Sequence, residues 1–346
     1  HCAVTEPDCR RRPVSTKKTA APSIDGTPAA EILRRLEITV TRRLDGLLQG
    51  DHRGLTPGHG SEPGEIRAYQ PGDDVRRIDW NVTARLGETH VRDSVADREL
   101  ETWILVDASA SLAFGTATCE KRDLALAAAA ATGFLTTRTG NRIGAMTIGP
   151  DGASPPIPAR SGRVHMQALL RRVLGALDNP QPGRTDLTAG LRRIAGTAKR
   201  RGLIVIISDF LDPGLWDAAL RALALRHDVL CIEVVDPVEL ELPDVGMLVL
   251  HDTVTGHEIE VPTGNAKFRE RYALAAAEQR AGIASRIRAS SADHLVLRTD
   301  RDWLLDLARF VSRRRDRIDP LSRSAAHGSG NVGALAGATL TTGAVR

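Results

Sequence analysis

From residue 102 to residue 315, short apolar runs alternate with longer segments of helical character. The apolar runs lie at 102–107, 142–148, 203–208, 229–235 and 294–298, and the helical segments at 121–137, 164–177, 187–199, 215–225, 266–288 and 302–315. A strand buried on both faces is apolar throughout, and each parallel strand needs a crossover connection. The pattern therefore predicts an α/β fold with a doubly wound, mainly parallel sheet of the Rossmann type over residues 101–318.

A separate N-terminal part is expected over residues 29–100. Apolar residues recur at helical spacing within 29–48, with arginines between them, which predicts an amphipathic helix docked on another part of the protein. Residues 52–65 are rich in Gly and Pro and predict an exposed loop. The rest of this part has only short strand-like runs, with a turn at Gly87. One helix and an irregular β subdomain should result.

The chain ends and one insertion complete the expected organisation. A hairpin insertion is predicted near 246–262, where apolar runs flank a turn at Val254-Thr255-Gly256. Residues 1–28 are polar and contain several prolines, and residues 319–346 are mostly Gly, Ala, Ser and Thr after a short charged start. Neither end carries enough apolar residues for a packed core, so both are predicted to be disordered arms.

Oxygen-bearing side chains follow two of the predicted strands. Asp107, Ser109 and Ser111 form a D-x-S-x-S run after the first strand, Thr185 lies in a loop before a helix, and Asp209 follows the strand at 203–208. The carboxyl ends of parallel strands meet at one edge of a sheet, so these side chains should converge there. Carboxylates and hydroxyls are hard ligands that suit Mg²⁺, which usually keeps some positions for other ligands.

Simpler roles are open to several of these residues. Asp and Ser often cap helices, so the D-x-S-x-S run could serve only as a cap. Thr185 could likewise cap the following helix, with Asp186 or Thr188 as the ligand from that loop. Asp212 is interpreted as a helix cap before Pro213 and is left out of the candidate site.

The order Asp107, Ser109, Ser111, Thr185, Asp209 resembles the metal-ion-dependent adhesion site of von Willebrand factor A domains. In addition, the run Tyr69–Trp80 (YQPGDDVRRIDW), followed by Thr83-Ala84-Arg85, is similar to the signature of the bacterial family known as domain of unknown function 58. Together these motifs cover roughly residues 29–318.

The resemblance implies a von Willebrand factor A-like fold and a metal, Mg²⁺ or possible Mn²⁺, held by those five residues. In that fold the vacant metal position accepts a carboxylate from a partner protein. Members of the family are often encoded beside MoxR-type AAA+ ATPases. The resemblance therefore implies that the partner is such an ATPase or its client, during protein-complex assembly or cofactor insertion.

A charged segment within the family signature offers a second candidate surface. Asp73, Asp74, Arg76 and Arg77 alternate in sign just before Trp80. One interpretation is a partner-binding surface near the edge of the sheet that carries the predicted metal site. The favoured interpretation is an ion-pair network that joins the irregular subdomain to the α/β core, with Trp80 as its anchor, because opposite charges so close in sequence can satisfy one another.

Composition narrows the function classes. The formal net charge is only +4, so no nucleic-acid partner is expected. Cys2, Cys9, Cys119 and Cys231 lack metal-ligand spacing, which favours a reduced, cytoplasmic protein. The uncharged stretches are too short or too polar to span a bilayer, so no stable membrane span is expected.

The sequence favours a non-enzymatic protein-binding module that uses Mg²⁺. Neither a Gly-x-Ser-x-Gly nucleophile motif nor a GxxxxGK[ST] phosphate loop is present. The place of the second aspartate in a haloacid dehalogenase-type phosphotransferase is taken by Ser109. The alternative is a Mg²⁺-dependent phosphate-ester hydrolase in which Asp107 or Asp209 activates water.

Overall fold

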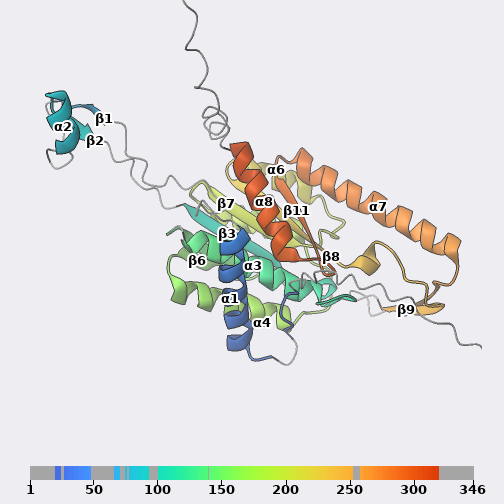
Figure 1. The fold of residues 1–346 in the computed structure, drawn as a ribbon. Coiled ribbons are helices and arrows are strands. Elements are labelled where there is room, and N and C mark those ends of the chain that lie inside the picture. The colour runs from blue at the N-terminus through green and yellow to red at the C-terminus, as the bar shows by residue number, and fades with distance from the viewer. Residues whose placement is uncertain are drawn as a thin grey trace, which may run out of the picture.

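The computed structural model describes most of the chain, and the fold is drawn in Figure 1. The described residues are 20–24, 27–47, 66–70, 75, 78–92, 100–138, 140–251 and 258–318. None of the helices within these ranges is both long enough and apolar enough to cross a membrane. The predicted tail at 319–346 and the hairpin turn at 254–256 lie outside the described residues.

A seven-stranded sheet forms the centre of the fold (Figure 1). Its order is β11 (Asp293–Arg298), β8 (Asp228–Val235), β7 (Gly202–Ser208), β3 (Glu101–Asp107), β4 (Arg142–Gly149) and β5 (Gly152–Ala153), with β6 (Ile157–Arg160) also paired to β4. The first five strands are parallel, whereas β5 and β6 run antiparallel to β4. The predicted α/β fold with a mainly parallel, doubly wound sheet is confirmed.

Helices cover both faces of this sheet. One face is covered by α3 (Lys121–Arg138), α4 (Arg163–Asp178) and α8 (Trp303–Ile318), and α1 (Ala29–Leu47) packs against these three helices. The other face is covered by α5 (Leu187–Thr197), α6 (Trp216–Ala224) and α7 (Ala266–Ala289). Strand β3 serves both cores: Ile104 and Val106 enter the first, and Trp103 and Leu105 the second. Burial of both faces explains why the strands are apolar throughout.

The helix α3 lies deepest of the helices. Its residues from Leu124 to Ala131 have no exposed surface. Small alanine side chains let α1, α4 and the sheet approach closely, which suits a chain with few aromatic residues. At the start of this helix, Asp123 accepts a 2.7 Å hydrogen bond from the backbone N–H of Ile24.

That contact corrects one boundary. Residues 1–28 were expected to form a disordered arm, yet Ala21 and Ile24 are buried in the core beside α3. The apolar side chains of this short segment pack before α1 begins, so the ordered part starts earlier than helical periodicity indicates. Residues 1–19 lie outside the described part of the chain.

Two small antiparallel ribbons stand outside the main sheet. The first pairs β1 (Ile66–Ala68) with β2 (His90–Arg92) around α2 (Trp80–Leu86), which begins at an Asp79 cap and ends at Gly87 in a left-handed conformation. The second pairs β9 (Met247–His251) with β10 (Glu258–Pro262). The hairpin predicted near 246–262 is therefore present, and α2 is a helix where only irregular structure was expected.

Candidate functional site

The candidate site lies where the strand order changes direction. Strands β3 and β7 are neighbours in the sheet, but the chain leaves β3 toward β4 and leaves β7 toward β8 on the opposite side. Asp107 ends β3, and Asp209 directly follows β7. Open α/β sheets bind ligands at the carboxyl ends of the strands beside such a switch point. The two aspartates therefore occupy the edge at which a ligand is expected.

The carboxylate of Asp107 is buried and doubly hydrogen-bonded. One oxygen accepts a 2.9 Å bond from the backbone N–H of Ser109, and the other accepts a 2.7 Å bond from the hydroxyl of Ser208. Burial and the neighbouring charge of Asp209 nevertheless raise the pKa of Asp107 to about 6. Two adjacent carboxylates thus need positive charge near them to remain ionised.

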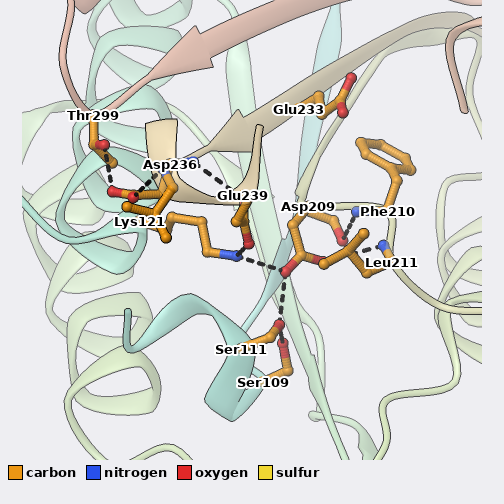
Figure 2. Close-up of polar contacts among 12 residues, drawn as sticks. Ser109, Ser111, Lys121, Asp209, Phe210, Leu211, Glu233, Asp236, Glu239 and Thr299 are labelled. Carbon is orange, nitrogen blue, oxygen red and sulfur yellow. Dashed lines mark hydrogen bonds and ion pairs between the residues drawn. The ribbon is translucent and has the colours of Figure 1, made fainter. Parts of the chain in front are cut away.

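A chain of hydroxyls joins the D-x-S-x-S run to Asp209 (Figure 2). The oxygens of Ser109 and Ser111 lie 2.9 Å apart, and Ser111 donates a 2.7 Å bond to Oδ2 of Asp209. The turn that bears the serines begins with Ser109 in an extended conformation, so both side chains project from one short segment. Four of the five predicted site residues therefore lie together.

The backbone after Asp209 is held in an unusual turn. Phe210 has a φ of 55°, in the left-handed region that non-glycine residues rarely adopt. Its N–H donates a 3.0 Å bond to Ser208, and its ring packs on Trp216 with centroids 5.5 Å apart. The N–H of Leu211 also bonds the second carboxylate oxygen of Asp209 at 3.2 Å. Such strain is typical of functional sites, where the surroundings fix the position of a side chain.

The loop that carries Thr185 runs beside both of these segments. Its start pairs with the serine turn through a Ser109–Gln181 bridge, and its end bonds the loop after Asp209, because the N–H of Leu187 donates 2.8 Å to Asp212. Within the described residues, the hydroxyl of Thr185 is buried and has no hydrogen-bond partner. A buried hydroxyl left unsatisfied is costly and calls for an explanation, such as a bound ion or water.

The structure gives Asp186, one of the two alternatives for the ligand from this loop, a different role. Asp186 is exposed and caps α5 by accepting a 2.8 Å bond from the N–H of Ala189, so its carboxylate is engaged elsewhere. Asp212 was interpreted as a cap before Pro213. Instead it binds the first N–H of α5 and the N–H of Gly214, and Leu215 precedes α6. Among the described residues of this loop, Thr185 is the one with a buried side-chain oxygen that lacks a partner.

One residue at the site was missed by the sequence analysis. Lys121, the first residue of α3, is 1% exposed, and its Nζ lies 3.0 Å from Oδ2 of Asp209 and 2.5 Å from Oε1 of Glu239 (Figure 2). Burial lowers the pKa of Lys121, but the two carboxylates outweigh burial and raise it. Burial likewise raises the pKa of Asp209, yet the Lys121 ammonium outweighs that effect and lowers it. A cation at the positive end of a helix was a signal, since the macrodipole disfavours it there.

The charges extend from Lys121 toward α7. Glu239, in the short helix Pro237–Glu239, also accepts a 2.9 Å bond from Arg280. Arg280 in turn contacts Glu233 at 2.9 Å and the carbonyl oxygen of Asp209 at 3.0 Å. Among the described residues, the lysine and arginine side chains that pair with the carboxylates of Asp209, Glu233 and Glu239 are those of Lys121 and Arg280, and Nε2 of His294 lies 2.7 Å from Glu233. With Asp107 included, the carboxylates outnumber these basic groups whether or not His294 is protonated, so negative charge remains for a bound dication to offset.

The carboxylate and hydroxyl oxygens at this edge fit a hard divalent metal ion. No group of three or more His, Cys, Asp or Glu suited to a metal occurs among the described residues. A metal at this edge would instead depend on hydroxyls, with Ser109, Ser111 and Thr185 beside the two aspartates. Hard oxygen ligands of this kind suit Mg²⁺ or Mn²⁺ and not the softer transition metals. The partnerless hydroxyl of Thr185 is consistent with such an ion.

The second candidate surface is only partly described. Asp73, Asp74, Arg76 and Arg77 lie outside the described residues. Trp80 begins α2 and is 69% exposed, so the expectation that it anchors the small subdomain in the α/β core is wrong. The short helix α2 buries none of its residues, which leaves this indole on the surface.

Comparison with known proteins finds close relatives. The uncharacterized protein Rv1480 of Mycobacterium tuberculosis is 54% identical over 292 residues, covering 84% of this chain and 92% of that protein. The uncharacterized protein MAV169 of Mycobacterium avium is 48% identical over 159 residues, covering 46% of this chain and 94% of that protein.

Similar solved structures include BatB from Bacteroides thetaiotaomicron, with 14% identity, a TM-score of 0.39 and coverage of 63% of this chain and 99% of that one. The SpRpn10 VWA domain is another, with 16% identity, a TM-score of 0.35 and coverage of 60% and 93%. The family model described as "Protein of unknown function DUF58" matches residues 65–282, which include the candidate site and the small subdomain. Together with the relatives of high identity, this match shows that the chain belongs to the DUF58 family.

Proposed function

We propose that this protein is a non-enzymatic, metal-dependent protein-binding module. The observation that carries the proposal is the convergence of Asp107, Ser109, Ser111 and Asp209 at the switch point, beside the loop that bears Thr185 with its partnerless hydroxyl. The side chains come from three segments far apart in the sequence. A purely structural sheet edge would not require an unsatisfied hydroxyl in that position.

The residues of this edge have separate parts in the proposal. Ser109, Ser111 and Thr185 would supply hydroxyl oxygens to Mg²⁺, while Asp107 and Asp209 would act directly or through water. When bound, the metal supplies a Lewis-acidic position that a carboxylate of the partner completes. Because Ser111 donates its proton to Asp209, its oxygen lone pairs are the better electron donors.

The partner in this proposal is a MoxR-type AAA+ ATPase or its client, met in the cytoplasm during complex assembly or cofactor insertion. This choice depends on the family resemblance. Exposed Trp80 would supply a second contact, together with Asp73, Asp74, Arg76 and Arg77, which precede it in the sequence. Large aromatic side chains on a surface are favoured anchors at protein interfaces.

The test is a binding measurement with the MoxR-type ATPase of the same genome. Biolayer interferometry would compare the wild-type chain in Mg²⁺ and in EDTA. The variant Ser111→Ala removes one oxygen of the site, and Ser161→Ala, at an exposed position outside it, is the matched control. We expect binding by the wild type and the control in Mg²⁺, and weak binding by Ser111→Ala or by any chain in EDTA.

Equal binding of the ATPase with and without chelator would refute metal dependence. The hydrolase alternative is tested with the same preparations, because an enzyme should release nitrophenol from p-nitrophenyl phosphate in Mg²⁺ and lose this activity in Asp209→Ala. Turnover with that dependence would replace the binding-module proposal.

A further inference from the structure

Lys121 stands behind the candidate metal site and cannot reach a partner. Its side chain is 1% exposed, and it begins a helix in which residues 121–136 are all buried. The ammonium divides its contacts between Asp209, at 3.0 Å, and Glu239, at 2.5 Å. It is therefore a fixed positive charge directly bonded to one of the two carboxylates on which the metal depends.

This contact makes the carboxylate of Asp209 a weaker ligand for a metal ion. Its Oδ2 already accepts from both Lys121 and Ser111, and its Oδ1 accepts from the N–H of Leu211. A dication entering the site would meet a carboxylate whose charge is partly offset by the ammonium. The two cations would also repel each other across a buried, weakly screened region.

A structural role alone is a poor explanation for Lys121. Burying an ion pair gives little net stability compared with apolar residues of similar size, because both charges lose their hydration. The same position at the start of an Ala-rich helix could hold a leucine if Asp209 and Glu239 were absent. The pair is thus better understood through what it does to the site in front of it.

We propose that Lys121 is an internal competing cation that keeps the intrinsic affinity of the site for Mg²⁺ low. This inference rests on the proposed metal-dependent function. A metal held weakly by the protein alone is retained well only when a partner carboxylate adds negative charge to the site. Lys121 would therefore make retention of the metal depend on the partner.

Glu239 sets how strongly Lys121 acts. It shares the ammonium with Asp209 and is itself held by Arg280 at 2.9 Å. Removing the charge of Glu239 leaves the ammonium to Asp209 alone, which should weaken Mg²⁺ binding. Removing the charge of Lys121 leaves Asp209 uncompensated, which should strengthen it. The two substitutions therefore act in opposite directions, although both break the same ion pair.

Calorimetric titration with Mg²⁺ alone tests this. Lys121→Met should bind Mg²⁺ at least about tenfold more tightly than the wild type, because loss of one unit charge beside a dication has roughly this effect even at the dielectric constant of water, and a larger one in a buried region. Lys121→Gln, whose side chain is neutral but can still donate hydrogen bonds, should also bind Mg²⁺ more tightly than the wild type. Glu239→Gln should bind more weakly. Lys199→Met, which removes an exposed lysine, is the matched control and should bind like the wild type.

Thermal unfolding in EDTA and in Mg²⁺ accompanies each titration, so that loss of fold is seen separately. Lys121→Met should be less stable than the wild type in EDTA, yet gain more on addition of Mg²⁺. Unchanged or weaker Mg²⁺ affinity in both folded Lys121 variants, with binding by the wild type, overturns the role of Lys121 and leaves the proposed site intact. Absence of Mg²⁺ uptake by every chain overturns both.

Discussion

Replacing Asp107 with asparagine should stabilise the metal-free protein. Asparagine keeps the shape of the side chain: its oxygen can accept from the N–H of Ser109, and its amide can donate to the hydroxyl of Ser208. Only the charge is lost. Burial and Asp209 make that charge unfavourable in the folded state, since they raise the pKa of Asp107 from 3.8 to about 6.

The magnitude follows from linkage. A raised pKa means that the protonated carboxyl favours the fold below pH 4, and that this contribution is lost as the pH rises through 6. The difference between 3.8 and 6 is about two pKa units, or at most about 3 kcal/mol at 1.4 kcal/mol per unit. In EDTA at pH 7.5, the free energy of unfolding of Asp107→Asn should therefore be up to about 3 kcal/mol higher than that of the wild type. The two values should converge near pH 4.

Urea unfolding at several pH values measures this, and Asp209→Asn is the matched control. The pKa of Asp209 is lowered by Lys121, so its charge favours the fold and its loss should destabilise the protein at pH 7.5. In Mg²⁺ the wild type should become more stable than Asp107→Asn, because only the wild type keeps all the proposed metal ligands. Should Asp107→Asn prove less stable than the wild type in EDTA at pH 7.5, the reasoning about this edge is refuted.

Three further predictions concern single positions. Thr185→Val should leave urea stability in EDTA unchanged or about 1 kcal/mol higher, because the hydroxyl has no partner, but should weaken Mg²⁺ uptake in calorimetry. Trp80→Ala should change stability by less than about 0.5 kcal/mol, as the side chain is exposed, while reducing ATPase binding in interferometry. Gly144→Ala should cost about 1–3 kcal/mol, since a new Cβ would lie 2.7 Å from the ring of Trp103 and 2.9 Å from the carbonyl of Ile157; equal urea midpoints would contradict this.

The strands and helices of the main sheet were predictable because each is long and strongly patterned. The helix expected at 121–137 is observed as Lys121–Arg138, and the strand expected at 203–208 as Gly202–Ser208. The short elements were not. Strand β5 has two residues, and β6 contains a proline at the sheet edge, so neither shows a period long enough to detect.

The helix α2 could have been found from local signals. Asp79 and Gly87 are typical cap residues, and they bracket WNVTARL. The absence of an apolar face hid the helix, since no residue in it is buried. Periodicity detects helices that pack on a core, whereas α2 does not.

Some residues of the candidate site could likewise be predicted from the sequence, and others could not. Its aspartates and serines could be placed from sequence because strand ends determine where they lie. For Lys121 the sequence offered only the weak signal of a cation at a helix start, where a lysine is ordinarily solvated, and it is the fold that shows Asp209 and Glu239 around it. The unsatisfied state of Thr185 is likewise a property of the packed loop and leaves no mark in the sequence.

The short segment before α1 has a practical consequence for where this protein can be cut. Ala21 and Ile24 fill part of the core, and the N–H of Ile24 satisfies Asp123 beside the first turn of α3. A chain trimmed to begin at Ala29 would uncover that core and deprive a buried carboxylate of a donor, only two residues from Lys121. Truncation within the predicted N-terminal arm would thus disturb the first turn of α3, which carries Lys121 into the candidate site.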